Sequence, residues 1–350
     1  MNIKLQSMNV KLIWISCLVT WVLPMLAWAH EVYVLPSESI ESAMNAVSPN
    51  PFLAYFGNES EFILWGLVSL IALATIACAT MFRLFESSLS PLLIPLKSLA
   101  LPLVRIATGI SVLSFGIAGA IFGTELPLQS MFGVFAPAVG WMFVVVGCLM
   151  TVGLYTREMS ILMLLAFAFS ASETGWYMLT YADHLGAYVA LFILGSGPFS
   201  IDHARGRPHA LRIPHLSTFV PYAFPALRIL FGIGVIFASI YAKYIHSQLA
   251  LDVVLIYDLT RFFPFDPLFV VLGALIIEFL AGLMLVLGIA IRWTNIFLLF
   301  WLTLSLLYFQ EAIWPHVILF GLAAALFCHG YDRFSLEGLV LKRRGREPLL

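Results

Sequence analysis

The sequence predicts an all-α, polytopic membrane protein with about nine transmembrane helices, eight of them in two parallel four-helix repeats. Three observations predict this fold class. Hydrophobic residues make up 61% of the 350-residue chain and charged residues only 11%, whereas soluble domains average about 25% charged residues. The apolar residues occur in runs that approach the roughly 20 residues needed to cross a bilayer. Segments in the two halves of the chain also resemble each other.

The charge balance and the missing motifs exclude several functional classes. The net charge is −1, so the chain lacks the excess of basic residues that a nucleic-acid partner requires. No Walker loop, Rossmann glycine fingerprint, HExxH or GxSxG pattern occurs. Nucleotide hydrolysis and acyl-enzyme chemistry are therefore not predicted. The lipid bilayer is the expected partner.

Residues 1–29 predict a signal peptide. Lys4 and Lys11 give a basic start, an apolar core follows, and A-W-A at 27–29 fits a cleavage site. Cleavage would make His30 the first residue of the mature chain, and the alternative is an uncleaved anchor helix. Both alternatives direct the chain to a membrane. Residues 30–60 are then an extracytoplasmic N-terminal segment.

Nine apolar segments follow the signal peptide. They cover residues 61–82, 99–122, 134–154, 158–173, 183–199, 218–243, 267–290, 293–310 and 313–329. With an exported N-terminus, 14 Lys and Arg residues lie on the cytoplasmic side, and only Lys243 and Arg261 lie outside. Because basic residues favour the cytoplasmic side, we expect an extracytoplasmic N-terminus and a cytoplasmic C-terminus in a bacterial-type inner (plasma) membrane.

Three pairs of segments match between the two halves of the chain. They are LVRIATGI (103–110) with ALRILFGI (226–233), GLYTREMSILMLLAFAFS (153–170) with GIAIRWTNIFLLFWLTLS (288–305), and LFILGSGPFSID (191–202) with LFCHGYDRFSLE (326–337). The first pair is offset by 123 residues and the others by 135, which predicts a longer outer loop in the second copy. The copies, 98–202 and 218–340, each hold four spans and enter from the same side, as parallel repeats do.

The remaining segments connect or flank these copies. Residues 61–97 hold one extra helix and a proline-containing linker that we expect at the inner interface. Residues 203–217 are a basic cytoplasmic loop, and 341–350 a basic cytoplasmic tail. In the first copy, Gly119 and Gly123 have the spacing that lets helices pack closely, which predicts packing within the bundle.

Sparse motifs recur in the same order in both copies. The second copy carries Arg228–Gly232, Lys243, Glu278–Gly282–Gly288, Arg292 and Gly330 with Ser335-Leu336-Glu337, and the first carries Arg105–Gly109, Gly147–Gly153, Arg157 and Gly195 through Asp202. This order resembles the DoxX/DoxD-like four-helix membrane proteins. The resemblance covers about 98–202 and 218–340. It implies a four-helix bundle for each copy. Because some members are subunits of a thiosulfate:quinone oxidoreductase, it also implies redox chemistry with a quinone.

The two copies differ in their polar residues. Glu278 corresponds to Phe143, and Lys243 corresponds to Ala120. A functional site is therefore expected in the second copy, with Glu278, Arg228 and Lys243 as the candidate catalytic residues. An ionised Glu278 near mid-membrane must pair, protonate or face water. It serves either as a proton-accepting carboxyl beside a quinone-sized cleft or as an inter-helix contact that holds the bundle together.

Its two candidate partners both precede it on one helix. Arg228 and Lys243 are 15 residues apart, or about 22 Å along a helix. One glutamate is therefore not expected to reach both.

The histidines on the outer side offer weaker candidates. His184 and His316 open corresponding spans of the two copies and are candidate axial ligands for a cofactor. His30 and His246 are candidate metal ligands, since an α-amine with an imidazole suits a borderline metal such as copper. No H-x-H or H-x₃-H pair supports either role. The alternative is that these histidines contact water or headgroups at the interface.

Three functional hypotheses remain. The first is a quinone-interacting subunit of a membrane oxidoreductase, in which Glu278 exchanges a proton. The second is a non-enzymatic protein that stabilises or assembles a partner complex, either in the membrane or on its extracytoplasmic side. The third is a proton-coupled transporter, because parallel repeats with an intramembrane carboxyl also occur in transporters.

Overall fold

A computed structural model describes residues 34–35, 37–81, 86–206, 213 and 215–343. The expected signal peptide, His30, residues 207–212 and 214 of the basic loop and the end of the C-terminal tail lie outside these residues. Within the described part, the chain is helical apart from turns and one isolated β-bridge between Ala120 and Pro127. The all-α prediction is confirmed.

Each of the nine apolar segments contains a helix. These helices are α4 (Glu59–Met81), α6 (Ala100–Ala118), α8 (Ala136–Val152), α9 (Thr156–Thr174), α10 (Ala182–Leu194), α12 (Val220–Ile240), α14 (Pro267–Leu287), α15 (Ile291–Phe309) and α16 (Ile313–His329). The shorter elements are α3 (Ser37–Asn45), η1 (Pro51–Tyr55), α5 (Glu86–Leu96), α7 (Leu128–Phe132), η4 (Gly175–Tyr181), α11 (Ile201–Ala204), η6 (Tyr241–Ile245), α13 (Ser247–Ile256) and α17 (Leu336–Arg343).

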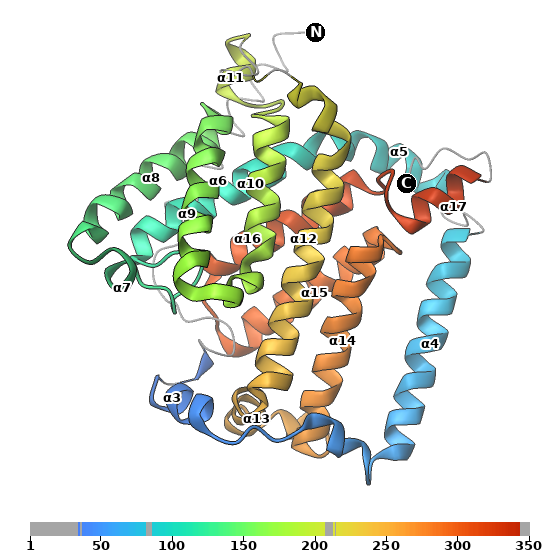
Figure 1. Cartoon of the computed structure of the whole chain (residues 1–350). Coiled ribbons are helices and arrows are strands. Elements are labelled where there is room, and N and C mark those ends of the chain that lie inside the picture. The colour runs from blue at the N-terminus through green and yellow to red at the C-terminus, as the bar shows by residue number, and fades with distance from the viewer. Residues whose placement is uncertain (1–33, 36, 82–85, 207–212, 214, 344–350) are drawn as a thin grey trace.

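The apolar helices make this chain a multi-pass membrane protein. Seven helical runs among the described residues are long and apolar enough to cross a bilayer. One of them, Thr156–Leu194, contains both α9 and α10, which pack side by side (Figure 1). The last of the nine helices, α16, has only 17 residues. The count of nine spans therefore stays a prediction.

The helices pack in two groups that meet along their first and last members. In one group α6 packs on α8 and α9 on α10, and in the other α12 packs on α14 and α15 on α16. Between the groups, α10 packs on α12 and α16 on α6 (Figure 1). One continuous apolar core results, with buried residues from both groups such as Phe115, Tyr188, Phe231 and Leu322. We call the two groups the first and second bundle.

Glycines allow the first two helices of each bundle to approach closely. A Cβ added to Gly147 would lie 2.3 Å from the backbone nitrogen of Leu113, so only a glycine fits between α8 and α6. A Cβ added to Gly282 would lie 2.8 Å from the carbonyl oxygen of Gly232, so the same holds for α14 and α12. The two bundles therefore use corresponding glycines for this contact.

The expected packing role of Gly119 and Gly123 is wrong. Gly119 ends α6 with φ +69, and Gly123 lies in the turn that follows. Glycine ends a helix in this left-handed conformation without a steric cost. The spacing that predicted a helix contact therefore marks a helix end.

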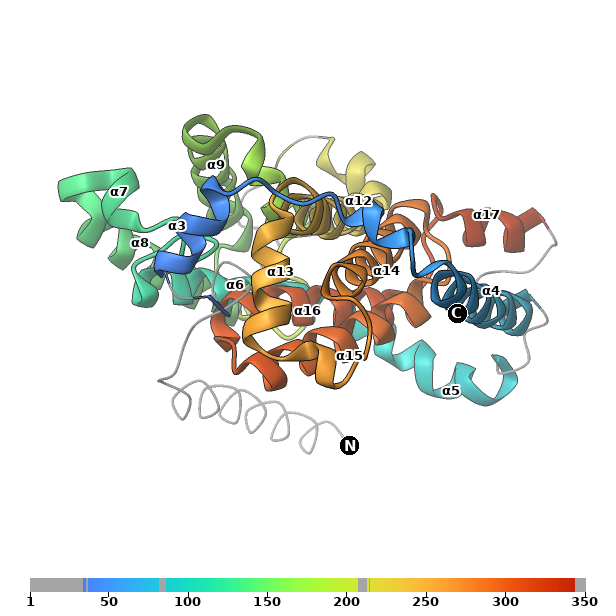
Figure 2. The ribbon, with the colours of Figure 1, turned by 90° about the horizontal axis from the view of Figure 1, so that it is seen from below.

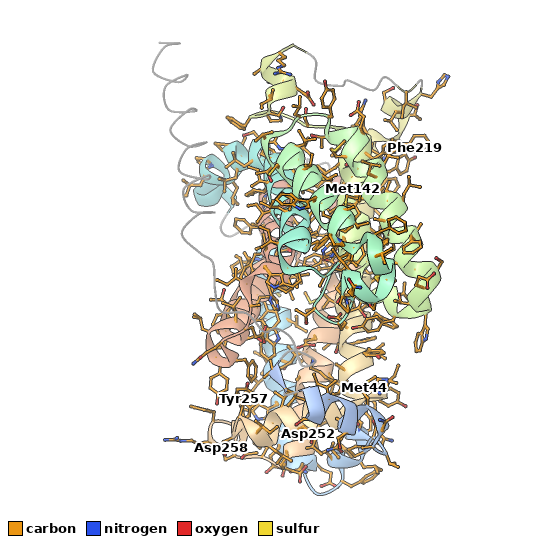
Figure 3. All side chains as sticks on the ribbon, turned by 90° about the vertical axis from the view of Figure 1, so that its left-hand side faces the viewer. Met44, Met142, Phe219, Asp252, Tyr257 and Asp258 are labelled. Carbon is orange, nitrogen blue, oxygen red and sulfur yellow. The ribbon has the colours of Figure 1, made fainter. Side chains whose placement is uncertain are left out.

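The N-terminal segment covers one end of the second bundle. Helix α3 packs on α13, and Leu35 and Ala43 form a small core with Leu249 and Val253 (Figure 2). In addition, the Ser247 hydroxyl donates to the carbonyl of Pro49. Figure 3 shows Met44, Asp252 and Tyr257 at this end and Phe219 toward the other. We call residues 34–56 together with α13 the outer cap, because the predicted orientation places them outside.

The extra helix stands at the edge of the molecule. None of the side chains of Glu59–Ile76 is buried, and Figures 1 and 2 both show α4 apart from the bundles. The linker that follows forms α5, which contains Pro91 and Pro95 and runs across the end opposite the outer cap (Figure 1). That end is the predicted cytoplasmic side.

Candidate functional site

Glu278 is paired with a cation inside the second bundle. Its carboxylate Oε2 lies 3.0 Å from Nζ of Lys243, and the indole nitrogen of Trp301 donates to Oε1 at 3.1 Å. The three residues come from α14, η6 and α15. An unpaired charge in hydrocarbon costs several kcal/mol, and a pair with hydrogen bonds to both oxygens offsets that cost. The structure thus shows how this span accommodates an acid.

The position of Lys243 depends on a local change in the helix. Residues Tyr241–Ile245 form a π-helical turn directly after α12. A π-turn adds a residue to a helical turn and changes the face on which later side chains emerge, and such turns often occur at functional sites. Lys243 is 7% exposed at its side chain and Glu278 19%, so the carboxylate keeps more access to its surroundings than the ammonium does.

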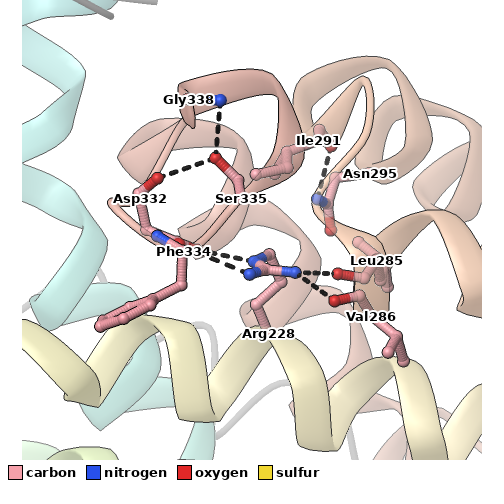
Figure 4. A network of polar contacts seen from close by, with 9 residues as sticks. All are labelled: Arg228, Leu285, Val286, Ile291, Asn295, Asp332, Phe334, Ser335 and Gly338. Atoms are coloured by element: carbon pink, nitrogen blue, oxygen red, sulfur yellow. Dashed lines mark hydrogen bonds and ion pairs between the residues drawn. The ribbon is translucent and has the colours of Figure 1, made fainter. Parts of the chain in front are cut away.

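Arg228 lies in a separate contact at the other end of the same bundle. Its Nε donates to the Asp332 carboxylate at 2.6 Å, and its NH1 donates to the carbonyls of Leu285 and Val286 (Figure 4). Those carbonyls end α14, where a cation also interacts favourably with the helix dipole. Glu278 thus reaches only one of its two expected partners, Lys243. Arg228 instead joins α12, α14 and the loop before α17.

The remaining motif residues hold the same end of both bundles. Asp202 accepts a hydrogen bond from the backbone nitrogen of Tyr155 at 2.9 Å, and Glu337 accepts one from Ala290 at 2.6 Å. The donor residues are 135 apart in the sequence, and so are the acceptors. In the first bundle, Arg105 donates to the carbonyls of Ser196 and Phe199. These residues therefore connect helix ends and loops.

Glu337 is a motif acid that lies outside the membrane spans and has a shifted pKa. Burial raises the pKa of this carboxyl, against the hydrogen bonds that the Tyr331 hydroxyl and the Ala290 amide donate to it. Desolvation disfavours the charged form, and the hydrogen bonds favour it. The carboxyl is partly buried and accepts hydrogen bonds from two donors, which suits a structural role.

His184 and His316 are buried beside carboxylates. His184 Nδ1 lies 3.2 Å from Asp183, and His316 Nε2 lies 3.0 Å from Glu311. The interpretation that these two histidines contact water or headgroups is therefore wrong, because neighbouring helices and loops cover both side chains. Sequence reasoning missed the two acids. The only signal was the presence of an acid one residue before His184 and five residues before His316.

A second polar cluster that the sequence did not reveal lies at the outer end of the first bundle. Glu125 accepts hydrogen bonds from the hydroxyls of Tyr177 and Tyr181. The ring of Tyr181 lies edge-on to His184, with ring centroids 5.8 Å apart. The first bundle thus has its own partly buried acid, although it lacks counterparts of Glu278 and Lys243.

The candidate metal ligands do not come together in the described residues. No group of three or more His, Cys, Asp or Glu side chains there has a metal-binding arrangement. His246 lies beside the ring of Tyr241, with centroids 4.7 Å apart, and partial burial lowers the pKa of its imidazole. His30 lies outside the described residues.

No family model, curated protein or solved structure matches this chain. The resemblance to the DoxX/DoxD-like proteins therefore stays a prediction based on the motif residues.

Proposed function

We propose that the chain is a quinone-interacting subunit of a membrane oxidoreductase, with its site at Lys243, Glu278 and Trp301. The observation that carries the proposal is the hydrogen-bonded ion pair inside a membrane span. Reduction of a quinone takes two electrons and two protons. The Lys243 ammonium would donate a hydrogen bond to a quinone carbonyl, and the Glu278 carboxylate would take up two protons from water in turn and pass each to the reduced quinone. The electrons would come from a partner subunit.

The packing around the site supports access from the bilayer. Helix α14 packs closely on α12 but only sparsely on α15, and Glu278 and Trp301 interact across the sparse side. Ile277 and Phe300, next to these residues, are exposed and thus face lipid in a membrane. A ligand dissolved in the bilayer could therefore approach the carboxylate between α14 and α15. The indole of Trp301 offers it a flat apolar surface.

Matching contacts in the two bundles support the proposed repeat. The close glycine contacts and the carboxylate-to-amide bonds of Asp202 and Glu337 recur at corresponding positions. We infer two DoxX-like copies that share a framework, of which only the second carries the ion pair. We also propose that the mature N-terminus is extracytoplasmic and that the protein resides in a bacterial-type inner membrane.

The experiment is mass spectrometry of the lipids and cofactors that co-purify with the detergent-extracted protein. Wild type, Glu278→Gln and the matched control Glu125→Gln are compared, because Glu125 is a partly buried acid in the other bundle. We expect near-stoichiometric quinone in the wild type and control and a loss of at least about tenfold in Glu278→Gln, which corresponds to about 1.4 kcal/mol of binding free energy. Absence of quinone from all three samples would contradict the proposal.

A second proposal is a non-enzymatic protein that stabilises a partner complex. The observation in its favour is α4, which is mostly apolar after its first turn and has no buried side chain in Glu59–Ile76. A helix that is hydrophobic on all sides is surrounded by lipid or by other protein. The same preparation distinguishes the two proposals, because a stoichiometric protein partner without quinone supports this one.

A further inference from the structure

The first bundle has an apolar groove on its membrane-facing side. The groove has a volume of about 510 Å³ and lies between α6, α7 and α8. Gly116 and Gly140 form its floor, and Ile117, Leu128 and Trp141 are among the residues around it. Trp141 is 71% exposed. No charged residue lines the groove, and its one amide side chain is that of Gln129.

The glycines of the floor serve the packing of α6 on α8. A Cβ on Gly116 would lie 2.2 Å from the carbonyl oxygen of Gly140, so this position must be glycine. A Cβ on Gly140 would lie 3.5 Å from the Gly116 carbonyl and 3.6 Å from Leu128, which is ordinary contact. Helix packing therefore explains Gly116, but the space above Gly140 stays open although a larger residue would fit there.

The second bundle shows which kind of side chain occupies the corresponding space. The residue that corresponds to Gly140 is Leu275, and the one that corresponds to Gly116 is Ser239. The Ser239 hydroxyl donates to the Leu275 carbonyl at 3.2 Å, as Gly116 closely approaches the Gly140 carbonyl, and both Ser239 and Leu275 are buried. Val271, the counterpart of Ala136 in the groove, packs against Ala250 and Val254 of α13.

In the second bundle, the aliphatic side chains of Leu275 and Val271 thus occupy the corresponding position. Helix α13 of the outer cap packs beside them. Among the described residues of the first bundle, the five-residue α7 lines the groove beside α6 and α8. The groove lies between helices of two membrane-crossing runs, Pro91–Ala118 and Leu128–Val152. It lies at the ends of these runs and is apolar apart from Gln129, so aliphatic atoms are the complement of its lining.

We propose that this groove binds one acyl chain of a bilayer lipid and retains it through purification. A helix with its side chains is about 10 Å across and rises 5.4 Å per turn, so about 510 Å³ would hold little more than one turn. A linear acyl chain is narrow enough to lie between α6, α7 and α8. The inference does not depend on the quinone proposal, because the groove and the Lys243–Glu278 pair are in different bundles.

The test uses a phosphatidylglycerol that carries a photoreactive diazirine on one acyl chain, reconstituted with the purified protein. Wild type is compared with Gly140→Leu, which recreates the side chain that the second bundle has at Leu275. Gly140→Met is a second filled variant, because an unbranched side chain adapts to irregular space. Gly273→Leu is the matched control, because a Cβ at Gly273 on α14 meets nothing within 4 Å.

We expect photolabelling of α6 and α8 peptides in the wild type and Gly273→Leu, and at least a fivefold loss in both Gly140 variants at unchanged thermal midpoints. Absence of label from these peptides in the wild type would overturn the proposal, as would full labelling of the filled variants. Displacement of the label by a long-tailed quinone but not by unlabelled phosphatidylglycerol would also overturn it. Quinone retention should be the same in all variants, so this result is separate from the first proposal.

Discussion

At the residue scale, the pairing of Glu278 explains how a carboxylate can lie within an apolar helix. Lys243 neutralises its charge at 3.0 Å, and Trp301 satisfies its second oxygen at 3.1 Å. The two cation–carboxylate contacts of this bundle have different roles. Arg228 and Asp332 close a helix end among backbone carbonyls, whereas Lys243 and Glu278 interact between helices within the spans.

Removal of one member of the pair should cost more than removal of both. Lys243→Met leaves the Glu278 carboxylate without its cation, and breaking a buried pair in this way costs about 3–5 kcal/mol. Lys243→Met combined with Glu278→Leu replaces the pair with apolar side chains and should recover more than half of that loss. The measurement is the free energy of unfolding by SDS titration in one lipid–detergent mixture.

Lys97→Met is the control for that comparison. Lys97 is exposed near the start of α6, so its loss should change stability by no more than about 0.5 kcal/mol. Equal losses in the single and double variants would show that the charge pair does not stabilise the bundle.

At the element scale, the two bundles begin their third helices in the same strained way. Tyr155 has φ +54 and Ala290 φ +46, each just after the glycine that ends the preceding helix. A side chain in this left-handed conformation costs about 1–2 kcal/mol. The hydrogen bonds from these two amides to Asp202 and Glu337 hold the strained turns in place.

Ala290→Gly should therefore stabilise the protein. Glycine adopts the left-handed conformation without strain, but its unfolded state has a larger conformational entropy, which offsets part of this gain. The free energy of unfolding should therefore rise by about 0.5–1 kcal/mol. Ala324→Gly, in the interior of α16, should lose about 0.5–1 kcal/mol. Unfolding midpoints in the same detergent test both changes, and a loss of stability in Ala290→Gly would show that the turn is not strained.

At the scale of the whole molecule, the packing of α10 on α12 and of α16 on α6 joins the bundles through corresponding helices. The two ends of the molecule carry different elements. The outer cap occupies one end, and α5, α11 and α17 lie toward the other (Figure 1). The distribution of Lys and Arg predicts that the second end faces the cytoplasm.

Single cysteines test this orientation. In a background with the native cysteines replaced, Asp258→Cys should react with a membrane-impermeant maleimide in intact spheroplasts. Arg205→Cys should react only after permeabilisation. Both side chains are exposed, at opposite ends of the molecule. The reverse labelling pattern would contradict the predicted orientation.

Sequence reasoning predicted the helices better than it predicted the contacts. Each of the nine apolar segments contains a helix, because hydropathy is a property of a local run of residues. The same reasoning assigned His184 to the membrane interface and Gly119 to a helix contact, and the structure buries the first and makes the second a helix end. Burial and packing depend on residues distant in the sequence, so a spacing rule alone did not reveal them.

By itself the sequence determined the membrane class, the places of the helices and the recurrence of the motif residues in two halves, because composition and spacing are readable along the chain. Only the tertiary structure decided that Glu278 pairs with Lys243 rather than with Arg228. The physical reason is that the π-helical turn at Tyr241–Ile245 and the crossing of α12, α14 and α15 set that contact. The groove beside Gly140 has a cause at both levels: the sequence puts a glycine where the second bundle has Leu275, and the tertiary packing puts the short α7 where α13 packs beside Val271 in the second bundle.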